Sequence, residues 1–120
     1  MRVFKNTWFT RFAGKEGITD SELRKLAGQL EEGQADANLG GDVYKIRVPR
    51  PGEGKSGGYR VIVFFRSEEK TFYVYGFATS DRDNIDQKEK SDYKELAKEY
   101  LNLSDEMIDR AVKSGKFIEI

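Results

Sequence analysis

Residues 59–78 read YRVIVFFRSEEKTFYVYGFA and carry the strongest strand signal in the chain. The stretch holds two runs of aromatic and β-branched residues, Tyr59–Arg66 and Thr71–Ala78, on either side of Ser67-Glu68-Glu69-Lys70. Such runs favour strands, and the charged tetrapeptide between them is typical of a hairpin turn. The stretch therefore predicts two antiparallel strands joined by a short turn.

A third strand is predicted just upstream, at Val43–Val48. This run reads VYKIRV and alternates with a period of two. In a strand, that period places Val43, Lys45 and Arg47 on one face and the other three residues on the opposite face. We therefore expect three consecutive strands that pair as an antiparallel meander.

A helix is predicted over residues 20–32. Thr19-Asp20-Ser21-Glu22 has the spacing of a capping box, in which Thr19 accepts from the Glu22 amide and Glu22 reaches back. Apolar residues then recur at helical spacing, as Leu23, Leu26, Ala27 and Leu30.

Weaker signals on both sides complete the predicted order of elements. We expect short strands at 2–5 and 117–120, a short helix around Trp8 and Phe12, a loop at 38–41, and helices at 84–103 and 104–115. This order predicts an α+β fold, with a small antiparallel sheet and helices packed on one face. The length fits a single domain spanning residues 1–120.

Composition excludes several kinds of chemistry. The chain has no cysteine, and therefore no disulfide or thiolate, and no histidine, which removes Ser-His triads and most zinc sites. Any acid–base step must use Lys, Arg, Tyr, Asp or Glu. No apolar run is long enough to span a membrane and no signal peptide is evident, so a cytoplasmic protein is expected.

A glycine-rich segment at 52–57 reads GEGKSG and matches the pattern GxGxxG. A dinucleotide-binding loop of this kind must lead into a helix, whose N-terminus meets the pyrophosphate. Here the segment leads into the strand at Tyr59. A Walker A motif ending at Gly54-Lys55-Ser56 would need glycine where Pro49 stands. Both patterns therefore argue against a nucleotide-binding loop.

The cations around this segment point to phosphate instead. Residues 43–66 carry six cations and Glu53 as the single acid, although the whole chain has no net charge. Lys45 and Arg47 share a strand face, and Arg60 opens the partner strand. Like charges placed side by side are unfavourable unless an anion joins them. We expect a phosphate site here, and the alternative is a solvated sheet face.

The segments 43–47, 58–62 and 72–77, together with the loop RPGEGKSGGYR at 50–60, resemble the RelE/HigB-like toxins of bacterial type II toxin–antitoxin systems. The loop is similar to one branch of that family. Further matching segments lie at 3–9, 38–41, 80–85 and 114–119, so the resemblance covers essentially the whole chain.

The resemblance implies a compact fold like that of microbial ribonucleases. It also implies an mRNA interferase, an endoribonuclease that cuts mRNA on the ribosome without a metal or another cofactor, inhibits translation and arrests growth. The implied partners are mRNA on the ribosome and a cognate antitoxin, typically a helix-turn-helix DNA-binding protein, with no membrane partner.

The resemblance also assigns site residues. Lys45, Arg47 and Arg60 match the catalytic cations of the family; we assign Arg60 to the scissile phosphate, and Lys45 or Arg47 to transition-state stabilisation or proton transfer. The residues expected to bind RNA are Arg50, Lys55, Tyr59 and Arg82.

The chain departs from the family pattern at two places. Thr79 stands where many relatives have a basic residue, and 84–87 lacks the tyrosine or histidine found near the last helix. Tyr75 either substitutes for that group or belongs to the core. One alternative is therefore a catalytically weak or inactive protein that binds and regulates the antitoxin, and another is a gyrase-targeting relative. Trp8, Phe9 and Phe12 can stack bases, but their helical spacing is more typical of core residues.

Overall fold

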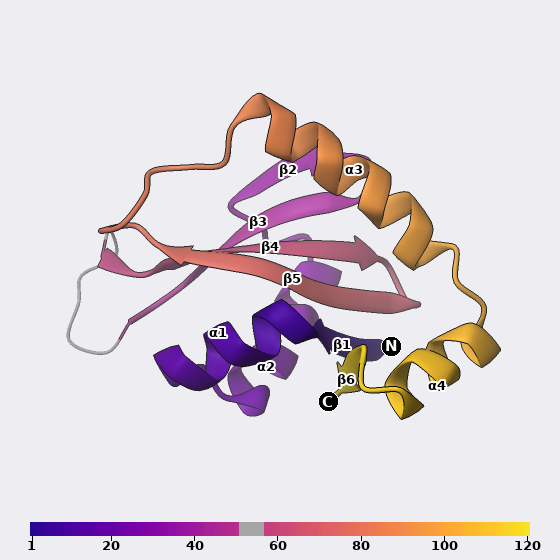
Figure 1. Ribbon diagram of the computed structural model, residues 1–120. Coiled ribbons are helices and arrows are strands. Elements are labelled where there is room, and N and C mark those ends of the chain that lie inside the picture. The colour runs from indigo at the N-terminus through magenta and orange to yellow at the C-terminus, as the bar shows by residue number, and fades with distance from the viewer. Residues whose placement is uncertain (51–56) are drawn as a thin grey trace.

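The computed structural model describes residues 1–50 and 57–120, and these form one mixed sheet with helices around it (Figure 1). The elements are β1 (Arg2–Asn6), α1 (Thr7–Glu16), α2 (Asp20–Glu31), β2 (Ala37–Gly40), β3 (Val43–Val48), β4 (Tyr59–Arg66), β5 (Lys70–Ala78), α3 (Gln87–Leu101), α4 (Asp105–Lys113) and β6 (Phe117–Glu119). Within the described residues the sheet has six strands in the order β2-β3-β4-β5-β1-β6. The predicted α+β fold is therefore confirmed.

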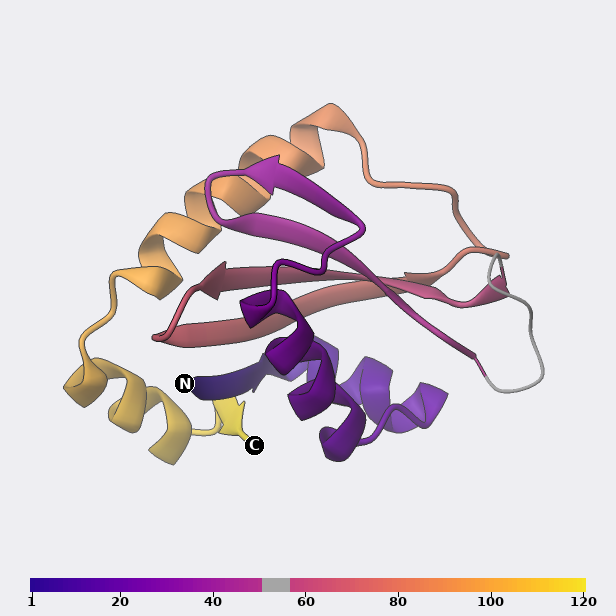
Figure 2. The same ribbon diagram turned by 180° about the vertical axis from the view of Figure 1, so that it is seen from behind.

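The central strand β4 is buried on both of its faces. Val61 and Val63 point into one core with residues of α1 and α2, whereas Ile62 and Phe64 point into a second core with residues of α3 and α4. Figure 1 shows α3 on the near side of the sheet, and Figure 2, from behind, shows α2 on the near side. The prediction that helices pack on one face is wrong, because a strand with consecutive apolar residues needs cover on both faces.

The sheet also departs from the predicted antiparallel meander. β3, β4 and β5 pair antiparallel as expected, but β1 pairs with β5 in parallel. The predicted loop at 38–41 contains most of a further strand, β2, which pairs with β3 and turns into it through Gly40, Gly41 and Asp42, all with positive φ. Single-sequence patterns missed β2 because it is short and lacks alternating apolar residues.

Helix capping explains where the helices begin. The capping box of Thr19 and Glu22 is present at the start of α2, and Ser104 caps α4, both as predicted. The helix α3 begins three residues later than predicted, at Gln87. Its N-cap is Asp86, whose carboxylate accepts from the amide of Glu89 at 2.8 Å while the Glu89 side chain accepts from the Asp86 amide.

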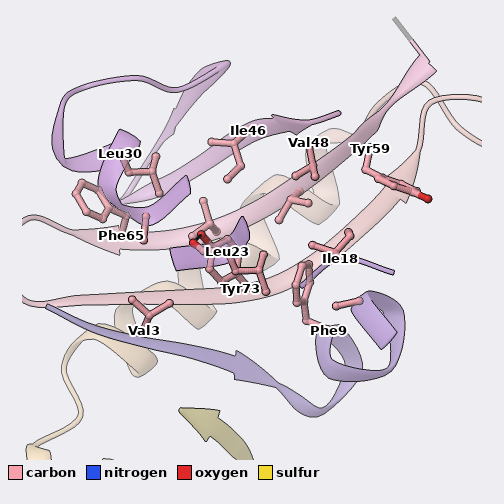
Figure 3. Packing of buried hydrophobic residues seen from close by; sticks show 14 of the residues in the cluster. Val3, Phe9, Ile18, Leu23, Leu30, Ile46, Val48, Tyr59, Phe65 and Tyr73 are labelled. Carbon is pink, nitrogen blue, oxygen red and sulfur yellow. Dashed lines mark hydrogen bonds between the residues drawn. The ribbon is translucent and has the colours of Figure 1, made fainter. Parts of the chain in front are cut away.

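The core between the sheet and α1 and α2 is centred on Tyr73 (Figure 3). Its ring stacks on Phe9 with centroids 5.4 Å apart, and its hydroxyl donates to the Leu23 carbonyl at 2.6 Å. Burial raises the pKa of Tyr73, so this hydroxyl stays protonated and remains a donor. The bond satisfies a buried polar group and ties α2 to β5.

Within residues 1–50 and 57–120, no helix is both long and apolar enough to cross a membrane.

The approach of α1 to β5 leads to a first prediction. A Cβ at Gly76 would lie 2.6 Å from Phe12 Cε2, so Gly76→Ala must displace the Phe12 ring. We expect the free energy of unfolding, measured in urea, to fall by about 1–3 kcal/mol. The control is Gly14→Ala in α1, where a Cβ has no neighbour within 4 Å and helix propensity should stabilise the protein by about 1 kcal/mol. Equal stabilities for the two variants would contradict this packing.

Candidate nucleic-acid interface

The strand register brings the predicted catalytic cations onto one face of the sheet. Arg47 of β3 lies directly across from Arg60 of β4, which lies across from Phe77 of β5. We call these three residues the arginine row. Lys45 lies two positions before Arg47 in β3, so its side chain is on the same face of the sheet. Strand alternation had predicted this adjacency of Lys45, Arg47 and Arg60.

The helix α3 covers the other half of the same face. Phe64 packs against Tyr100 at 5.6 Å and against Tyr93 at 6.3 Å between ring centroids. Figure 1 shows α3 over the half of the sheet nearest the β4–β5 turn, while the half toward residues 48 and 59 extends past the helix N-terminus. The arginine row lies on that extending half, with the Arg47 side chain 40% exposed.

Asp36, just before β2, joins the two arginines. Its Oδ1 lies 3.8 Å from Arg47 Nη2 and its Oδ2 lies 3.3 Å from Arg60 Nε. The Asp36 amide donates to the Lys45 carbonyl at 2.9 Å, which holds Asp36 beside β3. The anion that the facing arginines require is therefore supplied by the chain itself.

Arg60 has hydrogen-bonding capacity left over. Its side chain is only 14% exposed, and its Nη1 atom is buried without a hydrogen-bond partner. It is the only buried side-chain nitrogen or oxygen without a partner among the described residues. Leaving a donor of a charged group unpaired is unfavourable, so an acceptor atom entering here would gain more than at an exposed arginine.

Arg82, predicted to bind RNA, is held at the start of α3. Its guanidinium forms an ion pair with Glu89 through two hydrogen bonds and donates to the Tyr75 hydroxyl at 3.1 Å. It also lies over the ring of Phe77, 5.5 Å from its centroid. The hydrogen bonds to Glu89 raise the pKa of Arg82, and the same bonds hold the pKa of Glu89 below its ordinary range. The charge of Arg82 is therefore largely balanced within the protein.

Lys45 and Thr79 have nearby polar partners. Lys45 Nζ donates to Asn84 Oδ1 at 3.4 Å, which links β3 to the segment before α3. The hydroxyl of Thr79 donates to the Gly58 carbonyl at 3.0 Å, so this residue joins the end of β5 to the start of β4. Thr79, at the position where many relatives carry a basic residue, thus makes a structural hydrogen bond.

The prediction for Tyr59 requires correction. Tyr59 is 3% exposed and points to the core on the side of α1 and α2, on the opposite face from Arg60. Its ring packs edge-on against Phe12 at 5.7 Å, and burial raises the pKa of its hydroxyl. Successive residues of a strand point to opposite faces, so Tyr59 cannot share a surface with its neighbour Arg60.

Arg50, another predicted RNA-binding residue, lies over Tyr59 with its guanidinium carbon 5.5 Å from the ring centroid. The structure therefore does not place Arg50 in the arginine row. The predicted Lys55 lies outside the described residues.

The described residues contain no group of three or more histidine, cysteine, aspartate or glutamate side chains placed to hold a metal ion.

One known family matches the whole chain. The family described as "RelE toxin of RelE / RelB toxin-antitoxin system" matches residues 1–120. The chain belongs to the RelE toxin family. The resemblance to RelE-like toxins is thus confirmed, and membership implies a cognate antitoxin as partner. The assignment to the HigB-like branch stays a prediction.

Sequence reasoning missed two acids in this RelE family member, Asp36 and Glu89. Asp36 lies in a segment with no recognised pattern, and its partner Arg60 is distant in sequence. Glu89 had a usable signal, because it stands three residues after Asp86 in the spacing of a capping box. Both acids balance cations that were expected to be free for RNA.

A second prediction concerns Asp36 in this RelE toxin. Asp36→Asn removes the negative charge between two facing arginines, so the free energy of unfolding in low salt should fall by about 1–3 kcal/mol. Added inorganic phosphate should stabilise the variant more than the wild type, because the anion site is then vacant. Thermal melting with and without phosphate at constant ionic strength measures both effects. Equal phosphate responses would show that Asp36 does not occupy an anion site.

A third prediction concerns pH. The pKa of Glu89 is lowered in the folded protein, so its ion pair with Arg82 stabilises the fold above the ordinary glutamate range and is lost as the pH falls through the folded-state pKa. Glu89→Gln should therefore destabilise the protein at neutral pH, and the difference from wild type should shrink in acid. Urea unfolding at several pH values tests this. A difference that stays constant from neutral pH to acid would contradict it.

Proposed function

We propose that this RelE family toxin is a metal-independent, ribosome-dependent mRNA endoribonuclease that inhibits translation in the cytoplasm. The observation that carries the proposal is the arginine row, in which Arg47 faces Arg60 and Arg60 Nη1 is buried without a partner. A phosphodiester has acceptor oxygens and a charge suited to such a pair.

The proposed reaction uses the RNA itself as nucleophile. The ribose 2′-hydroxyl loses its proton and attacks the adjacent phosphorus, the bond to the 5′-oxygen breaks, and that oxygen takes up a proton. The products are a 2′,3′-cyclic phosphate and a 5′-hydroxyl end. No metal or oxidant is needed, so the protein must align the attack and stabilise the extra negative charge on the phosphorane.

The positions of the cations suggest how they divide this work. Arg60 is fixed on the central strand and would hold the scissile phosphate through two donors. Arg47 would replace its distant contact with Asp36 by one to the phosphorane oxygens. Lys45, on the same face of β3, is placed to assist a proton or to add positive charge.

The cognate antitoxin is proposed to be a helix-turn-helix DNA-binding protein, following the branch that the loop at 50–60 resembles. The mRNA substrate is proposed to be bound on the ribosome.

A second function is favoured by a specific observation. Asp36 balances the positive charge of the arginine row, and Glu89 balances that of Arg82. Thr79 stands in place of a basic residue and donates its hydroxyl to a backbone carbonyl. A toxin fold with its cations already paired could serve as an antitoxin-binding module that regulates DNA binding. This function needs no cleavage, so it makes the opposite prediction in cells.

The deciding experiment compares wild type and Arg60→Ala, each induced without antitoxin. Wild type should arrest growth and create new mRNA 5′ ends, mapped by primer extension, in register with codons. Arg60→Ala should reduce cleavage by roughly 100-fold or more, since one buried charge-stabilising donor is lost. The matched control is Arg110→Ala, an exposed arginine on α4, which packs beside the edge strand β6 away from the arginine row; this variant should cut like wild type.

Normal growth with unchanged transcripts, while wild-type protein accumulates in folded form, would favour the antitoxin-binding module. Full cleavage by a folded Arg60→Ala protein would remove Arg60 from the site.

A further inference from the structure

An aromatic pocket lies beside the arginine row, between α1 and the last part of β5. The parallel pairing of β1 with β5 ends at Lys5 and Tyr73, after which the chain turns into α1 and this helix runs along the β5 edge. Phe9 of α1 is completely buried, but Trp8 is 44% exposed. The helical pattern predicted both as core, and the structure separates them.

The pocket has a volume of about 320 Å³. Its walls include the rings of Trp8, Phe12, Tyr75 and Phe77. Trp8 stacks on Phe12 with centroids 5.3 Å apart and 17° between ring planes, and its ring lies 4.6 Å from Tyr75. The volume is at the low end of small-molecule sites, roughly 300–1,000 Å³, and suits one flat ring system.

The charged residues at this pocket carry both signs. Lys15 and Arg82 contribute positive charge, and Glu16 and Asp81 contribute negative charge. Because Arg82 is already paired with Glu89, this rim does not select phosphate, but it offers donors and acceptors side by side. An uncharged planar ligand whose edge carries both donors and acceptors fits these walls and this rim. A nucleobase has that chemistry.

The pocket and the arginine row share Phe77. Phe77 is the strand neighbour of Arg60 and is itself a member of the row. The Phe77 and Tyr75 centroids are 6.1 Å apart, and Tyr75 is the ring that Trp8 contacts. A phosphate at Arg60 would therefore leave the base of an adjoining nucleotide close to the Trp8 ring.

We propose that Trp8 and Tyr75 form a nucleobase subsite that stacks the base next to the scissile phosphate and sets the base preference of cleavage. The subsite rests on the proposed ribonuclease function. It explains why a tryptophan is left half exposed where α1 packs beside the edge of β5. Exposed aromatic faces are used for base stacking because every base presents a π-face.

The test compares Trp8→Leu with Trp8→Phe in a cell-free translation system, using purified toxin and mapping mRNA 5′ ends over time. Leucine keeps apolar contact with Phe12 but cannot stack a base, whereas phenylalanine keeps a ring. We expect Trp8→Leu to slow cleavage roughly tenfold or more and to flatten the base distribution beside the cut, and Trp8→Phe to retain most of both.

Met107→Ala is the matched control, because Met107 is an exposed apolar side chain on α4 and is 53% exposed. It should cleave with the rate and base distribution of wild type. Urea unfolding verifies that each variant is folded, and calorimetry separately measures binding of the cognate antitoxin.

Cleavage by Trp8→Leu with the wild-type rate and base distribution would overturn the subsite while leaving the ribonuclease in place. Equal losses in the leucine and phenylalanine variants would overturn the stacking role. A leucine variant that cleaves normally but loses antitoxin binding would show that the pocket holds a protein partner. A wild-type toxin that cuts no mRNA would overturn the proposed function, and the subsite with it.

Discussion

Burial of β4 on both of its faces is the constraint on which the rest of this structure depends. Its consecutive apolar residues must alternate into two cores, so helices are needed on each side of the sheet. Each core has its own helices, with α1 and α2 on one side and α3 and α4 on the other. The strand is thereby held in one register, because a slip by one residue would exchange the side chains of the two cores.

That register fixes the candidate site. Arg60 lies on the rigid central strand, where its side chain is mostly buried, and the pairing with β3 sets Arg47 directly across from it. Two arginines so placed need a nearby anion, and Asp36 provides it. A site on strands rather than on a loop holds its charged groups in place before any ligand arrives, which is what phosphate chemistry requires of a catalyst.

The charge balance of the site bears on the proposed binding of RNA by a protein without net charge. The cations are paired with acids of the same chain, as Arg82 is with Glu89, so we expect RNA to replace internal contacts rather than settle on free charge. The cost of that exchange should lower nonspecific binding to nucleic acid, which depends on unpaired positive charge. Strand alternation could place the cations on one face but could not reveal Asp36, because an ion pair between residues distant in sequence leaves no local pattern.

Local patterns determined much of this protein. The three central strands, the capping box at Thr19 and the α+β class follow from alternation, helical spacing and capping residues, and strand alternation alone put Lys45 and Arg47 on one face. Tertiary structure decided the second helical layer, the parallel pairing of β1, the burial of Tyr59 and the contact of Asp36 with Arg60. The physical reason is that periodicity reports which residues are apolar within one element, whereas partners and faces are chosen by burial summed over the whole chain.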